Sequence, residues 1–253
     1  GSQLNVQSSF IGLLIIFICC FISAGIWGYI PAYLKEKRGV HEVISTIMLN
    51  FIAAGIASYF AVYVYRDTLS QNPQTKPVKE VFKLNNYQLF SGSPVNVTLF
   101  ISILIALILL FFLYKTSLGF EIRSLGENQK AAENYGINSF KVRTKTLFIA
   151  AGIAGLSGFA EVLGRFYCYK IDFSPGYGFT GIVVAFLARH NPIAIIFSAL
   201  LFGIIQKGCA DLEIYTQNVT SDLALIFQAI ILIIACSDEF FQILFKKRFS
   251  KSS

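Results

Sequence analysis

The sequence predicts an all-α fold, a polytopic transmembrane helix bundle, and three observations support this prediction. Hydrophobic residues make up 55% of the 253 residues and charged residues only 14%, whereas soluble domains carry about 25% charged residues. Most of the apolar residues gather in runs long enough to cross a bilayer. The Lys and Arg residues stand in short groups at the ends of these runs, which is typical of membrane orientation and not of a nucleic-acid groove, despite the net charge of +7.

The apolar runs predict about seven membrane segments, including one short broken helix. A spanning helix needs about 20 mostly apolar residues, and fewer where protein shields its backbone. The expected segments cover residues 10–33, 43–65, 97–114, 146–163, 179–188, 193–206 and 222–235. We expect the first to end near Pro31, because proline removes a helical hydrogen bond.

The basic residues between the segments predict the orientation of the chain. If the segments alternate, the groups at 35–38, 115–145, 189 and 246–251 share one side, which the positive-inside rule makes cytoplasmic. The N-terminus is then outside and the C-terminus cytoplasmic. An outside start with an odd number of segments suggests that residues 1–253 form a single transmembrane domain lacking the N-terminal helices of a longer protein. The turn-rich loop 66–94 is expected to be extracytoplasmic.

The cytoplasmic loop 115–145 contains a candidate docking element. Residues 127–135 have a helix-forming composition, with Ala131 and Ala132 among charged residues. We expect Gly126 to open this helix and Gly136 to close it in a left-handed conformation. Such a helix could dock in a groove of a soluble partner, or it could be a solvated linker.

Polar and glycine-rich positions within the segments are candidates for a substrate pathway. Gly178 and Phe179 open a short apolar run after a glycine- and proline-rich stretch, so we expect this run to lie inside the bundle beside a cavity. Asn50 is a candidate for hydrogen bonding to a substrate or to another helix, and Glu161 for a ligand contact or simple hydration. Gln228 is interpreted as a bond between helices.

Small residues are concentrated in the segment 146–163. Ala and Gly three and four positions apart let a neighbouring helix approach closely. The segment could flex beside a pathway or pack tightly and statically, and we favour static packing.

Three motifs, in consistent order from about residue 25 to 240, resemble one transporter family. They are Gly39-Val-His-Glu-Val-Ile-Ser-Thr-Ile-Met-Leu-Asn50, then Leu125-Gly-Glu-Asn-Gln-Lys-Ala-Ala-Glu-Asn-Tyr-Gly-Ile-Asn138 with Lys141-Val-Arg143, then Gly178-Phe-Thr-Gly-Ile-Val-Val-Ala-Phe-Leu-Ala-Arg-His-Asn-Pro192 with Leu201-Phe-Gly203. This pattern resembles the permease subunit of bacterial ABC importers, in the branch of branched-chain amino acid, simple sugar and nucleoside permeases. It is most similar to the nucleoside group.

The resemblance implies a transport subunit of the inner membrane that forms a nucleoside pathway. Its implied partners are cytoplasmic ABC ATPase subunits, a second permease subunit and an extracytoplasmic substrate-binding lipoprotein; no cofactor or metal is implied. Residues 123–138 correspond to the coupling helix that the ATPase holds. The coupling residues carried over are Arg123, Gly126, Glu127, Asn128, Ala131, Ala132, Gly136 and Asn138. The sequence lacks a GxxxxGK[ST] phosphate loop, so ATP hydrolysis is expected of a partner and the chain is not expected to be an enzyme.

The sequence is also compatible with other functions. The same importer could carry riboflavin or a simple sugar, and a membrane scaffold without transport is a second class. An intramembrane enzyme would need paired carboxylates or histidine-based ligand sets, whereas the sequence has only two His, both near loops, and no HExxH or GxSxG motif.

Overall fold

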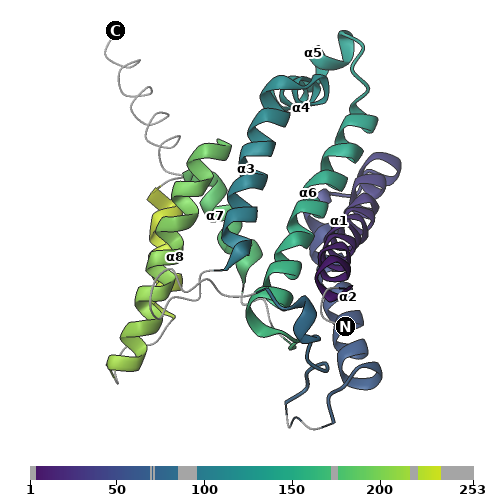
Figure 1. Cartoon of the computed structure of the whole chain (residues 1–253). Helices are drawn as coiled ribbons and strands as arrows, with labels where there is room; N and C mark the ends of the chain where they lie inside the picture. Colours follow the sequence, from purple (N-terminus) through teal and green to yellow (C-terminus); the bar gives the residue numbers. More distant parts are fainter. Residues whose placement is uncertain are drawn as a thin grey trace. The chain divides into compact units, whose positions relative to one another are not determined.

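The computed structural model describes residues 4–68, 70, 72–84, 96–171, 176–216 and 222–234, and these residues are mainly helical. The α-helices are α1 Leu4–Arg38, α2 Glu42–Tyr59, α3 Val97–Lys115, α4 Ser117–Glu127, α5 Gln129–Asn134, α6 Ser139–Glu161, α7 Tyr177–Leu187, α8 Pro192–Tyr215 and a last helix Leu223–Ile234 (Figure 1). Within these described residues, five helices are long and apolar enough to cross a membrane, and α7 and Leu223–Ile234 are shorter apolar helices. The predicted polytopic all-helical fold is confirmed.

The ends of several helices differ from the prediction. Pro31 does not end α1, which continues to Arg38 and closes at Gly39, where φ is +65° and the N–H donates to the Lys35 carbonyl at 3.0 Å. The helix α6 begins at Ser139 and α8 ends at Tyr215, outside the predicted segments. Each extension carries polar residues, which a search for apolar runs leaves out.

The chain divides into two compact units. The first comprises Gly1–Ser102 and Phe111–Phe173, and the second Ile103–Leu110 and Ser174–Ser253, so that α3 has residues in both. Residues 85–94 of the predicted turn-rich loop 66–94 and the basic tail 246–251 lie outside the described residues.

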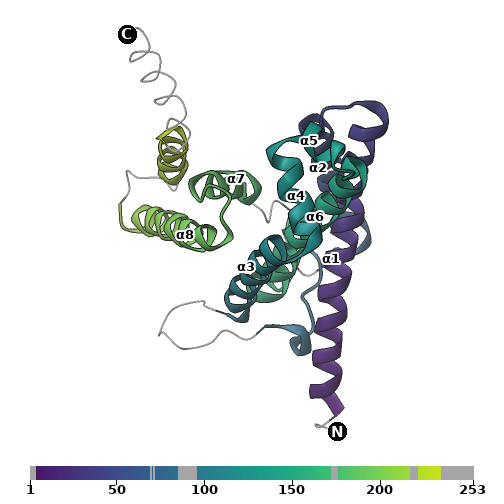
Figure 2. The same ribbon diagram turned by 90° about the horizontal axis from the view of Figure 1, so that it is seen from above.

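The first unit is built on α1 and α6, which lie side by side along most of their length (Figure 2). Small residues allow this approach. A Cβ added at Gly28 of α1 would overlap Ala151 and lie 3.0 Å from the Leu147 carbonyl oxygen. A Cβ added at Gly155 of α6 would overlap Ala24 of α1 in the same way. Because backbone stands opposite backbone, these positions cannot accept a side chain without moving the helices.

Two phenylalanines complete this contact reciprocally. Phe21 of α1 covers Gly152 of α6, and Phe148 of α6 covers Gly25 of α1. The two rings meet edge to face, with centroids 6.2 Å apart. The small residues of the segment 146–163 therefore serve tight packing in the structure, as we favoured.

One end of the α1–α6 pair is covered by the loop that follows α2. The helix α2 continues into a π-helical turn, η1 Phe60–Val64, and α6 continues into a second one, η3 Val162–Phe166. A 3₁₀ turn, η2 Glu80–Phe82, lies within the loop itself. The Val78 N–H donates to the Tyr167 carbonyl at 2.7 Å, and the Leu84 N–H to the Leu163 carbonyl at 3.0 Å. Leu84 and Leu163 are buried with Phe159 in one apolar cluster. The described part of the loop is thus irregular but well bonded.

The second unit packs α7, α8 and Leu223–Ile234 around a small apolar core of Val183, Val184 and Phe202. At 11 residues, α7 is only about 16 Å long, too short to span the roughly 30 Å hydrocarbon layer. Gln228 is buried, and its amide oxygen accepts a hydrogen bond from the Thr180 hydroxyl of α7 at 3.3 Å. The interpretation of Gln228 as a link between helices is confirmed.

The close approach of α1 to α6 predicts a sharp difference between two glycines of the same helix. Replacing Gly155 by Leu should lower stability by about 1–3 kcal/mol, since the side chain meets backbone. A Cβ at Gly158 meets nothing within 4 Å, so Gly158→Leu is the matched control. Thermal unfolding of the detergent-solubilised protein measures both variants, and equal unfolding temperatures would contradict the packing described.

Candidate functional site

A capped pair of short helices, α4 and α5, connects α3 to α6 at one end of the first unit. Thr116 begins α4 by accepting a hydrogen bond from the Gly119 N–H at 3.1 Å. Asn128 begins α5 by accepting from the Ala131 N–H at 3.1 Å, and Asn138 begins α6 by accepting from the Lys141 N–H at 3.0 Å. These side chains bind the orphan N–H groups at each helix start and fix both corners of the connection.

The chain leaves the helical conformation at Asn128, between α4 and α5. This break corrects the prediction of a single helix over residues 127–135. Glu127 is the last residue of α4, so residues 127–135 form not one helix but the end of α4 and all of α5. Gly126 lies within α4 and opens no helix. Gly136 follows α5 with φ at +86°, and its predicted left-handed conformation is confirmed.

α5 presents one face to the protein and the other to the surroundings. Ala132 is buried, and only 3% of its surface is exposed, whereas Ala131 and Lys130 are exposed. Tyr135, at the end of α5, is 89% exposed. A large exposed aromatic ring on a short capped helix is suited to insertion into a pocket of another protein.

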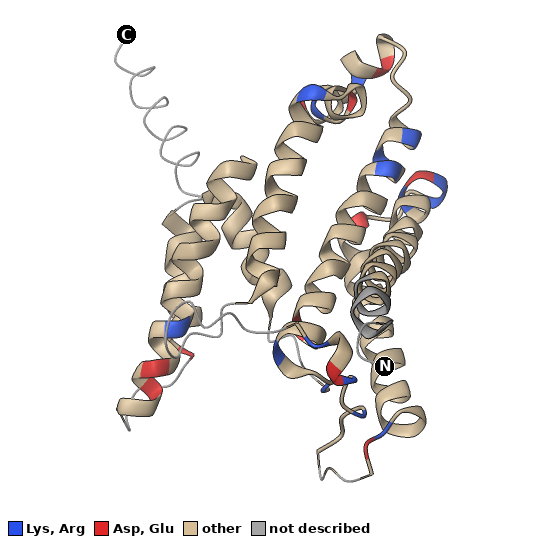
Figure 3. Cartoon of the chain, in the orientation of Figure 1, with Lys and Arg blue, Asp and Glu red and all other residues tan. Residues whose placement is uncertain are grey.

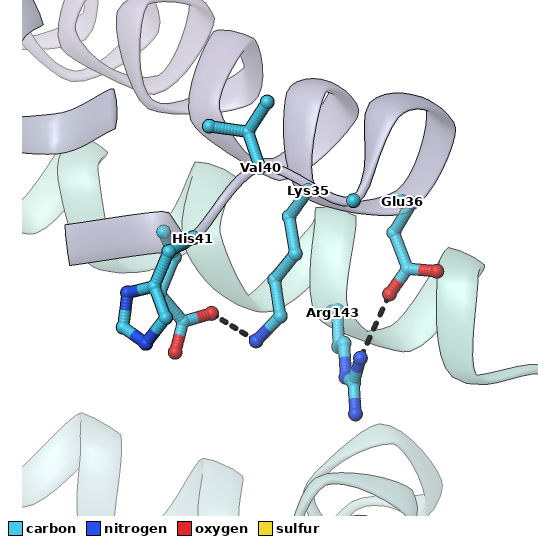
Figure 4. A pocket seen from close by; sticks show the side chains of 7 residues that line it. Lys35, Glu36, Val40, His41 and Arg143 are labelled. Carbon is cyan, nitrogen blue, oxygen red and sulfur yellow. Dashed lines mark hydrogen bonds and ion pairs between the residues drawn. The ribbon is translucent and has the colours of Figure 1, made fainter. Parts of the chain in front are cut away.

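Ion pairs join the start of α6 to the turn between α1 and α2. The Arg143 guanidinium donates to Glu36 at 2.9 Å, and Lys35 pairs with Glu42 of α2 (Figure 4). Arg143 also donates to Gln129 of α5. The α1–α2 turn and the α4–α5 connection therefore lie at the same end of the first unit, as the alternation of segments predicted. The Lys and Arg residues of this unit gather toward its two ends, with an uncharged stretch between them (Figure 3).

Two hollows adjoin these ion pairs, and another lies beside the end of α5. One of 290 Å³ is lined by the α1–α2 turn and Arg143, and one of 360 Å³ by apolar residues of α4 and α6 beneath the same charges. A third, of 390 Å³, lies beside Tyr135, Gly136 and Asn138. The α4–α5 connection thus offers both a projecting helix and adjacent recesses to a partner.

The polar groups of α5 also favour a charged, solvated surface. The Gln129 amide donates to Glu133 at 2.9 Å, and this bond, with smaller contributions from Ser139 and from the charge of Arg143, holds the pKa of Glu133 below its ordinary value. Glu133 is therefore ionised at neutral pH. Arg123 of α4 lies over the Tyr114 ring of α3, 4.9 Å from its centroid, which attaches α4 to the end of the span.

The predicted pathway residues are divided between the two units, with Asn50 and Glu161 in the first and Gly178 and Phe179 in the second. Asn50 is exposed on α2. Glu161 of α6 lies 3.6 Å from Arg165, and its second carboxylate oxygen is buried without a hydrogen-bond partner among the described residues. Gly178 and Phe179 belong to the second unit, where Phe179 is 72% exposed at the start of α7. Within the described residues, no cluster of His, Cys, Asp and Glu could hold a metal ion.

Sequence reasoning missed the contacts of Glu36, Gln129 and Arg143. Arg143 belongs to the motif Lys141-Val-Arg143, but its charge was used only to predict on which side of the membrane the loop lies. Its partner Glu36 is 107 residues away, so no local pattern could have indicated the pair.

Comparison with known proteins identifies the family. Residues 2–236 match the model of the branched-chain amino acid transport system permease component. The chain is 31% identical to a guanosine ABC transporter permease of Bacillus subtilis, covering 90% of this chain and 66% of the relative. It is 27% identical to a glucose ABC transporter permease of Haloferax volcanii, covering 94% and 65%, and 31% identical to a nucleoside ABC transporter permease of Lactococcus lactis, covering 77% and 55%.

No solved structure matches the chain. The chain spans two thirds or less of the length of these relatives. The match over most of its residues confirms the recognised family, and its long apolar helices agree with a location in the cytoplasmic membrane. The chain belongs to the branched-chain amino acid transport system permease family, the membrane-embedded subunits of ABC importers.

Proposed function

We propose that this chain forms the substrate pathway of an ATP-driven importer and that α5 is the coupling helix held by a separate cytoplasmic ATPase. The observation that carries the proposal is the exposed α5, capped by Asn128 and carrying Tyr135, between the two long apolar helices α3 and α6. A solvated linker would need neither the caps nor the buried Ala132 that fix α5 on the bundle.

The proposal includes the orientation predicted from the sequence. The α4–α5 end faces the cytoplasm, because basic residues of two short loops, 35–38 and 115–145, gather there. The loops 35–38 and 115–145 together carry nine Lys and Arg residues, whereas the loop 66–94 at the opposite end of the first unit carries four. The N-terminus is then outside and the C-terminus cytoplasmic.

In the proposed mechanism, ATP-driven closure of an ATPase dimer displaces α5, and the attached spans move as a rigid body to alternate access. A second permease subunit, identical or related, completes the pathway, and an extracytoplasmic binding lipoprotein delivers the substrate. The family membership supports these partners in general terms.

We further propose that the substrate is a nucleoside. Two of the relatives described above are named for guanosine or nucleoside transport, at 31% identity each. The glucose permease, at 27% identity, makes a simple sugar the runner-up, and riboflavin is a further candidate within the same mechanism. Asn50, Glu161, Gly178 and Phe179 are the residues proposed to line the pathway.

The coupling assignment predicts that α5 can be disabled without unfolding the spans. Glu127→Arg at the end of α4 combined with Ala132→Phe in α5 should lower ATP-dependent uptake by about tenfold or more, because a ring at buried Ala132 displaces α5 from the bundle and the reversed charge at residue 127 alters the surface offered to the partner. The measurement is uptake into proteoliposomes that contain the complete importer. Lys37→Glu, an exposed charge change at the same end, is the control. Uptake as fast as that of the unaltered importer would refute the assignment.

The substrate assignment predicts a ranking. Guanosine or another nucleoside should raise the unfolding temperature of the complete importer with its binding lipoprotein, because a ligand that binds the native state stabilises it by mass action. Riboflavin, glucose and a pentose at the same concentration should not. A shift produced by riboflavin or a sugar alone would replace the nucleoside assignment while leaving the importer mechanism intact.

A further inference from the structure

Arg143 is in contact with two helices besides its own. From α6 it donates through Nη1 to Glu36 of α1 at 2.9 Å and through Nη2 to the Gln129 side-chain oxygen of α5. The side chains of Arg143 and Glu36 are only 26% and 19% exposed. A planar guanidinium fixes the directions of both bonds, and partial burial reduces their screening by salt. One side chain therefore joins α1, α5 and α6.

A second ion pair continues the connection to α2. Lys35, next to Glu36 in α1, pairs with Glu42 in the first turn of α2 (Figure 4). Glu42 and Glu133 also lie close enough to Arg143 to feel its charge. The start of α2 is thereby attached to the end of α1, and Glu36, Glu42 and Glu133 place acidic charge near Arg143, whose other neighbouring charge is the paired Lys35.

The α1–α6 pair can transmit a displacement because its two helices cannot slide freely. Ala151 fills the space beside Gly28, and Ala24 the space beside Gly155. A force applied to the start of α6 thus moves α1 with it, since well-packed interfaces resist continuous deformation. The contact that connects α5 to this pair then decides whether movement of α5 reaches the spans.

We propose that Arg143 is a positioning residue that fixes α5 to the α1–α6 pair, so that displacement of α5 is passed to α1 and, through Lys35 and Glu42, to α2. This inference rests on the proposed role of α5 as the coupling helix. It adds a residue inside the permease that passes the displacement of α5 to the spans. This residue lies beneath the surface that the ATPase is proposed to bind.

The first test compares transport with ATP consumption in the same proteoliposomes. Arg143→Met removes both bonds and keeps the length of the side chain, and it should lower the substrate moved per ATP hydrolysed by about fivefold or more. ATP hydrolysis itself should persist, because α5 and Tyr135 remain. Gln129→Leu, at an exposed position, removes the link from Arg143 to α5 and the Gln129–Glu133 bond within α5, keeps the Arg143–Glu36 pair, and should show the same direction of change. Arg143→Lys, which keeps the charge without the fork, should be intermediate.

Lys37→Met is the matched control, since it removes a positive charge from an exposed side chain of the same turn. It should leave the transport-to-ATP ratio unchanged. An unchanged ratio in both Arg143→Met and Gln129→Leu would overturn the inference, and so would an equal loss in Lys37→Met.

The second test does not depend on transport. Spin labels at the exposed positions Asn134 of α5 and Met48 of α2, in a complete importer whose native cysteines are replaced, report the distance between the two helices. Arg143→Met and Gln129→Leu should broaden this distance distribution, whereas Lys37→Met should not. A distribution equally narrow in all variants would overturn the link. If the unaltered importer hydrolysed ATP without uptake while both link variants broadened the distribution, the proposed function would fail and the link would stand.

Discussion

The contact between α1 and α6 is the constraint on which the rest of the first unit depends. Gly28 and Gly155 bring the two backbones together, and Phe21 and Phe148 close the contact from either side. In a bilayer, helices gain little by hiding apolar surface from lipid, so close packing must hold them together. The α1–α2 turn, the α4–α5 connection and the loop after α2 are all attached to the ends of this pair.

The α4–α5 connection is stabilised by hydrogen bonds and ion pairs instead of close packing, because it lies at the polar end of the unit. Asn128 and Asn138 bind the free N–H groups of the helices that they begin, and Arg143 bonds to both α1 and α5. These bonds leave Tyr135 exposed while Ala132 stays buried. A closely packed pair of spans with an attached projecting helix is the arrangement that the proposed coupling to a separate ATPase requires.

The sequence predicted the number and place of the apolar segments well, because the thickness of the hydrocarbon layer sets their length. It failed at their ends: Pro31 is accommodated inside α1, and α6 starts at Ser139, since polar turns continue helices beyond the apolar runs. The left-handed conformation of Gly136 was predictable from its place at the end of a helix-forming stretch. The place of Gly126 inside α4 was not, because the Asn128 cap decides where α5 begins. The Glu36–Arg143 pair depends on tertiary packing and has no local signal.

The side of the membrane on which α5 lies tests the central claim most directly. A cysteine placed at exposed Asn134, in a chain whose native cysteines are replaced, can be labelled with a membrane-impermeant maleimide in intact cells and in inverted vesicles. We predict labelling only in inverted vesicles, with protection when the ATPase subunits are bound. Labelling from the outside of intact cells would contradict the assignment of α5 as the coupling helix.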